Sequence, residues 1–128
     1  MERISVLSKY SFLVCILAIL VFSTLPKLQL GSYEIWKGFN LRVDYLLHFL
    51  AYLVLSASFL LWRKQNRFIP LITIFLFGAI FSLGLEFQQN FIAGRGYSLP
   101  DLYFNLLGLL VGSIISFIVK ALDKAKDD

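Results

Sequence analysis

Four long stretches of this sequence contain no aspartate, glutamate, lysine or arginine. Each is 17 or 18 residues long, and they run from Tyr10 to Pro26, from Tyr45 to Trp62, from Phe68 to Leu85 and from Leu102 to Val119. A helix of that length rises roughly 26 Å and, with one flanking turn, crosses the ~30 Å hydrocarbon core of a bilayer. A chain of 128 residues, 59% of them apolar, cannot bury four such helices in a water-soluble fold. The missing charges therefore exclude a soluble domain.

The sequence also lacks the features of several other protein classes. The four stretches have no alternation of polar residues, which the strands of a membrane β-barrel need for their lumen face. The single cysteine, Cys15, cannot form an internal disulfide bond, and a packing role is favoured for it. We predict an all-α polytopic membrane protein with a single domain over residues 1–128. Its fold is predicted to be an antiparallel bundle of four transmembrane helices at about 8–26, 44–62, 68–91 and 101–120.

The net charge of +4 reports topology rather than nucleic-acid binding, because the basic residues lie at helix ends and not on one surface. The first stretch also has features of a cleaved signal peptide, but a retained helix agrees better with the charges. With the N-terminus inside, eight basic residues are cytoplasmic and four are outside. The outer four are Lys27, Lys37, Arg42 and Arg95. This asymmetry predicts that both termini are cytoplasmic.

The two outer loops differ in composition. The longer one, from Lys27 to Val43, carries Tyr33, Trp36 and Phe39 at three-residue spacing. This spacing predicts a short interfacial helix or a re-entrant flap, with an irregular loop of aromatic anchors as the alternative. The second loop places Arg95 between two glycines, on flexible backbone.

Polar residues interrupt the second and fourth helices at a common spacing. Asp44 and His48 are four residues apart and so share one helix face, and Asp101 and Asn105 repeat the pattern. The two aspartates begin their helices, where a carboxylate can act as an N-terminal cap without any further role. A single histidine can likewise be a neutral core residue bonded to a neighbouring helix. A site role and a structural role therefore both remain open for these residues.

The third helix supplies Glu86 and Gln89 on one face. Glu86 follows an uncharged run and cannot be an N-terminal cap, so it has a functional role or bonds to His48 or Arg95. His48, Glu86 and Asn105 lie at similar depths on three helices, about one turn below the outer rim. Ionisable groups inside a bilayer usually face the bundle or a wet cavity. We therefore predict an outward-facing polar pocket with Arg95 above it.

Small residues extend the same faces and predict close helix packing rather than chemistry. They include Gly78 and Ser82 in the third helix and a GxxxG pattern in the fourth, Gly108 and Gly112.

Two motifs at a fixed separation resemble the VanZ-like family. They are residues 44–52 (DYLLHFLAY) and 86–95 (EFQQNFIAGR), followed by Ser98, Asp101, Asn105 and Gly108. The resemblance implies a bacterial integral membrane protein, and the family's namesake is associated with resistance to the glycopeptide antibiotic teicoplanin. Carried over to this chain, the family pattern marks Asp44, His48, Glu86, Gln89, Arg95, Asp101 and Asn105.

Two functions are consistent with such a pocket. The favoured one is a protein of the bacterial cell envelope, in the cytoplasmic membrane, that binds a lipid-linked cell-wall precursor, an amphipathic ligand, membrane lipid or another membrane protein. The alternative is an intramembrane hydrolase or transferase in which Glu86 or His48 is the general base. Asp101 or Asp44 would orient that base, and Arg95 would hold a phosphate or carboxylate.

Cofactors leave no clear signal in the sequence. Asp, Glu, His and Asn can all bind Mg²⁺, Mn²⁺ or Zn²⁺, but there is no HExxH motif, no CxxC motif and no second histidine. We therefore predict no metal site and assign no cofactor. A purely structural subunit, whose polar cluster fixes helix register, is a third interpretation.

Overall fold

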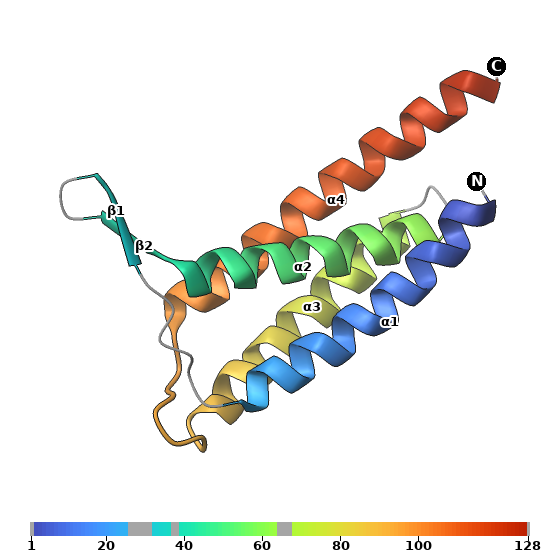
Figure 1. The fold of residues 1–128 in the computed structure, drawn as a ribbon. Helices are drawn as coiled ribbons and strands as arrows, with labels where there is room; N and C mark the ends of the chain where they lie inside the picture. The colour runs from blue at the N-terminus through green and yellow to red at the C-terminus, as the bar shows by residue number, and fades with distance from the viewer. Residues whose placement is uncertain (1, 26–31, 37–38, 64–67, 128) are drawn as a thin grey trace.

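Each uncharged stretch forms the body of one helix in the structure, a computed structural model that describes residues 2–25, 32–36, 39–63 and 68–127. The helices are α1 (Glu2–Thr24), α2 (Val43–Trp62), α3 (Phe68–Gln89) and α4 (Leu99–Asp127). Consecutive helices run in opposite directions, so the two termini lie at the same end of the bundle (Figure 1). All four are long and apolar enough to cross a membrane. The predicted four-helix membrane bundle is confirmed.

The outward surface of the helices is apolar. Leu17, Ile80, Ile118 and Phe68 are each more than half exposed. A water-soluble protein rarely shows apolar surface over its whole circumference. Lipid tails are the solvent that suits this surface, and the hydrophobic effect then leaves helix association to close packing and hydrogen bonds.

Helix ends differ from the ranges expected from charge alone. α1 begins at Glu2 and α4 continues to Asp127, because charged residues are compatible with helix where it leaves the hydrocarbon core. α3 ends at Gln89, and the next three backbone N–H groups form tighter bonds that each span three residues. Gly94 then adopts a left-handed φ of 76°, which favours glycine, and turns the chain toward α4.

The segment before α2 forms a small β-hairpin. Strand β1 (Ser32–Trp36) pairs antiparallel with β2 (Phe39–Arg42), in a register that sets Tyr33 opposite Leu41. The prediction of a short interfacial helix here is therefore wrong. Aromatic and β-branched residues favour strands, and three-residue spacing over so short a segment does not establish a helical period.

Helices α2 and α4 form the closest contact in the bundle. The Cα atoms of Gly108 and Gly112 in α4 lie so near α2 that an added Cβ atom would overlap the carbonyl oxygens of Phe49 and Leu53. The hydroxyl of Ser116 also donates to the carbonyl oxygen of Ala57 at 3.2 Å. The GxxxG pattern therefore has the packing role predicted for it.

The core forms around α2, which packs against all three other helices. Leu55 and Leu109 are fully buried, and Tyr52 and Ile74 are nearly so. This central position brings one turn of α2, at His48, against the beginning of α4 and the end of α3. The start of α2, the end of α3 and the start of α4 thus lie at the end of the bundle opposite the termini (Figure 1).

Candidate functional site

A chain of side-chain hydrogen bonds fixes the imidazole of His48. The amide nitrogen of Asn105 donates to the hydroxyl of Ser82 at 2.7 Å, and the amide oxygen faces His48 Nδ1 at 3.0 Å. Because that oxygen can only accept, Nδ1 carries the hydrogen and donates. The other ring nitrogen, Nε2, then points toward Asp101, whose Oδ2 lies 3.7 Å away.

At the start of α4, Glu86 accepts the hydrogen bond that the acidic residue of a capping box would normally accept. Ser98 precedes the helix, and its hydroxyl accepts from the N–H of Asp101 at 3.4 Å. In an ordinary capping box the acidic residue three positions on would accept from the cap N–H in return. Here the Ser98 N–H donates instead to Glu86 Oε2, at 3.3 Å. The carboxylate of Asp101 is therefore left to face His48.

These residues form a buried group at the ends of three helices. Glu86 is 1% exposed, Asn105 2% and Asp101 6%. One potential ligand atom from each of His48, Glu86 and Asp101 lies within 4.8 Å of the other two. Such a set of one imidazole and two carboxylates can hold a cation, bind a polar group or transfer a proton.

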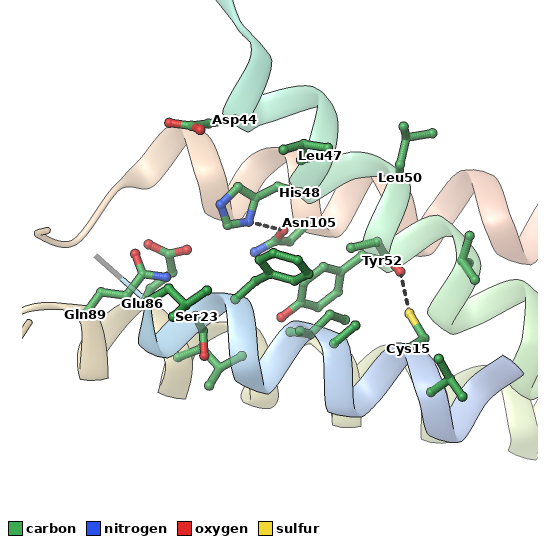
Figure 2. A pocket seen from close by; sticks show the side chains of 18 of the residues that line it. Cys15, Ser23, Asp44, Leu47, His48, Leu50, Tyr52, Glu86, Gln89 and Asn105 are labelled. Atoms are coloured by element: carbon green, nitrogen blue, oxygen red, sulfur yellow. Dashed lines mark hydrogen bonds between the residues drawn. The ribbon is translucent and has the colours of Figure 1, made fainter. Parts of the chain in front are cut away.

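An elongated cavity begins at this group and runs between α1 and α2. Its volume is about 520 Å³, within the range typical of ligand sites. One end is polar (Figure 2), with side chains of Asp44, His48, Glu86, Gln89 and Asn105. Arg95 also lines the cavity. Along the rest of its length the walls are mainly apolar, and Val14, Leu47, Leu50 and Val54 are at least 41% exposed there. The cavity therefore opens sideways, toward lipid.

Comparison with known proteins gives one match. A family model described as VanZ/LLP1 matches residues 8–120, which include all four helices. The chain belongs to the VanZ/LLP1 family. No curated protein and no solved structure matches it. The match confirms the resemblance drawn from the two motifs, and the residues of both motifs lie inside it.

In this VanZ/LLP1 protein the three residues that were expected at equal depth lie together around one cavity. His48, Glu86 and Asn105 all line the cavity. Gln89 lies beside them and is 4% exposed. Asp101 lies 3.7 Å from His48 Nε2 but does not line the cavity. The helical spacing in the sequence therefore selected side chains that the fold brings together.

Arg95 and Asp44 lie at the rim of this group. Arg95 reaches back to α1, where its guanidinium donates to the carbonyl oxygen of Ser23 at 3.4 Å. Asp44 forms an ion pair with Arg42 at 2.6 Å. Partial desolvation lowers the pKa of Arg42, but the charge and hydrogen bond of Asp44 outweigh it and raise the pKa above its ordinary value. Arg42 is therefore a fixed positive charge at this rim.

Neither Asp44 nor Asp101 is the N-terminal cap of its helix. The residue that caps α2 is Arg42, with no side-chain cap bond, and Asp44 lies inside the first turn. For α4 the cap is Ser98, as described above. The structural interpretation of both aspartates as N-terminal caps is therefore wrong, although each still benefits from the positive end of its helix.

Sequence reasoning missed the contribution of α1 to the cavity. Ser11, Cys15, Ala18 and Ser23 all line it, and the Cys15 thiol donates to the carbonyl oxygen of Ala51 at 3.2 Å. The available signal was a stripe of small residues at spacings of four and three in Ser11, Cys15 and Ala18. Small side chains on one face of a membrane helix commonly mark the side that meets another helix.

Proposed function

We propose that this VanZ/LLP1 protein binds an amphipathic, lipid-linked molecule of the cell envelope. The polar group of the ligand would occupy the end of the cavity at His48 and Glu86, and its hydrocarbon chain would follow the groove between α1 and α2. The observation that carries this proposal is the shape of the cavity, which is polar at one end only and open to lipid along its side. Such a cavity has the same polarity along its length as a lipid molecule.

The polar end suits an anionic or hydroxyl-rich headgroup. Arg95 can form paired hydrogen bonds to a phosphate or carboxylate, and its Nε is buried with no hydrogen-bond partner among the described residues. Gln89 and Asn105 add amide groups on the same side. Lipid-linked cell-wall precursors carry such groups, and so does membrane phospholipid. Binding of a precursor is the route by which the protein would contribute to glycopeptide resistance.

We place the protein in the bacterial cytoplasmic membrane with both termini in the cytoplasm, so that the polar end of the cavity faces the outer leaflet. The support is the excess of basic residues at the end that holds the termini. Cysteine labelling in a Cys15→Ser background tests this placement. A membrane-impermeant maleimide applied to intact cells should label Tyr97→Cys, whose side chain is 45% exposed, but not Lys64→Cys. Labelling of Lys64→Cys alone would reverse the orientation and refute the outward-facing site.

Lipid mass spectrometry tests the ligand. The wild-type protein, purified in mild detergent, should retain one lipid-linked species in amounts near one per chain. Ala18→Phe should lose most of it, because Ala18 lines the groove and the added ring would fill the space of the hydrocarbon chain. Ala121→Phe is the matched control, since Ala121 is exposed on α4 and is not part of the cavity wall. Equal retention by all three proteins, or bulk phospholipid alone, would contradict the proposal.

An intramembrane hydrolase or transferase is the second candidate. It is favoured by the fixed imidazole of His48, whose Nε2 faces a carboxylate while Asn105 holds Nδ1. A base oriented in this way by a neighbouring group is a common arrangement in catalysis. Substitution of Glu86 separates the two candidates, because binding tolerates an amide at this position and general-base catalysis does not.

A further inference from the structure

We propose that His48, Glu86 and Asp101 bind a divalent transition-metal cation at the polar end of the cavity. The three side chains come from α2, α3 and α4, and their ligand atoms already lie within 4.8 Å of one another. Two donors on a tetrahedral Zn²⁺ with bonds of about 2.0–2.2 Å are roughly 3.3–3.6 Å apart, so side-chain rotations that bring the ligand atoms about 1 Å closer complete the contact. This inference does not depend on the proposed amphipathic ligand.

The hydrogen bonds of His48 prepare it as a ligand. Asn105 accepts from Nδ1–H, and Ser82 in turn holds the amide group of Asn105 in that orientation. In the neutral ring the lone pair is then on Nε2, on the side of Asp101. A lone pair aimed at a carboxylate is unfavourable unless a proton or a cation lies between them. Metal-binding histidines in proteins usually have their other ring nitrogen bonded in this way.

Two carboxylates of this group are buried, and one oxygen of Asp101 is left without a hydrogen bond by the residues that the structure describes. Glu86 and Asp101 are both more than nine-tenths buried, and the oxygen in question is Asp101 Oδ1. A buried carboxylate requires a partner of opposite charge, a hydrogen bond or a metal ion. At 3.7 Å, the separation of His48 Nε2 and Asp101 Oδ2 is too long for a hydrogen bond. A cation at this position would bridge His48 Nε2 and Asp101, and Glu86 lies close enough to join them.

The donor set indicates the class of metal. Mg²⁺ and Ca²⁺ prefer oxygen ligands throughout, whereas an imidazole with two carboxylates suits Zn²⁺ or Mn²⁺. The thiol of Cys15 is not near the group, since it lies toward the other end of the cavity (Figure 2). Three protein ligands leave at least one coordination position for water or a ligand. His48 and Glu86 line the cavity, so that position would border the polar end.

Metal binding by the full chain tests this proposal. The protein in detergent is first stripped with a chelator and then titrated with Zn²⁺, Mn²⁺ or Mg²⁺, with calorimetry and elemental analysis as readouts. The wild-type protein should bind one equivalent of Zn²⁺ or Mn²⁺ and should bind Mg²⁺ far more weakly. His48→Gln and Asp101→Asn should each weaken that binding on the order of 100-fold or more, since even an outer hydrogen-bond partner is worth 10–100-fold.

Asp123→Asn is the matched control, because it removes one carboxylate from the far end of α4 and should leave metal binding unchanged. Thermal unfolding of each chelator-treated variant shows whether its bundle is intact, so a misfolded variant is not read as a lost ligand. The proposal fails if the wild-type protein binds no equivalent, or if His48→Gln and Asp101→Asn fold and bind as the wild-type does.

Discussion

Changing Gly108 to leucine is expected to prevent the bundle from forming, with a loss of roughly 3 kcal/mol or more. Even the first added carbon would overlap the carbonyl oxygen of Phe49 and approach the backbone nitrogen of Leu53 to 2.9 Å. Backbone cannot move aside as a flexible side chain does, so α4 would have to separate from α2. Because Asp101 and Asn105 lie on the same helix, the polar group would be lost with the contact. Thermal unfolding and size-exclusion profiles in detergent measure the effect.

Gly84→Leu provides the matched control for this substitution. Gly84 lies in α3 with nothing within 4 Å of an added Cβ atom, and the position is exposed. The same glycine-to-leucine change should therefore leave the unfolding temperature close to that of the wild-type protein. Gly108→Ala should fall between the two. If Gly108→Leu were as stable as Gly84→Leu, the close contact between α2 and α4 would not be what holds the bundle together.

Changing Glu86 to glutamine is expected to weaken function by about tenfold and to leave the bundle folded. Glutamine keeps an oxygen that can accept from the Ser98 N–H, so the start of α4 should stay in place. Replacing a charged acceptor with a neutral one costs about 1.5 kcal/mol, which is about tenfold in binding. Loss of a general base would instead reduce turnover by about 10²–10⁴-fold. Retained lipid and teicoplanin susceptibility, at matched expression, are the readouts.

Two further variants make the result at Glu86 interpretable. Gln88→Ala changes an exposed neighbour that points away from the group and should behave as the wild-type protein. Glu86→Asp keeps the carboxylate but withdraws it by one carbon. If Glu86→Gln removed all function from a folded protein and Glu86→Asp restored part of it, the hydrolase or transferase would replace ligand binding as the better account.

The sequence was sufficient for the parts of the fold that depend on one helix at a time. A long stretch without charged residues identifies a membrane-spanning helix, because an unpaired charge in hydrocarbon costs free energy whatever the helix packs against. Spacing of four residues predicts that His48 shares a face with Asp44, and common depth brings His48 level with Glu86 and Asn105. These inferences need helix geometry only, and the structure places all of these side chains around one cavity.

The parts that failed depend on contacts between elements. Ser98 caps α4, and its N–H donates to Glu86, which lies twelve residues earlier in the sequence. No local sequence pattern predicts a hydrogen bond between residues so far apart. The hairpin before α2 was missed because helix and strand preferences are both weak in so short a segment.

The most extensive helix contact, between α2 and α4, has a consequence for how the chain is made. These helices are separated in sequence by the whole of α3, so a growing chain must hold three helices in the membrane before its main pairing becomes possible. Helices can insert one by one and associate afterwards. Before α4 is inserted, His48 cannot bond to Asn105, and Glu86 cannot accept from the Ser98 N–H. A chain truncated before residue 99 would therefore insert three helices in the membrane without the main helix contact of the bundle.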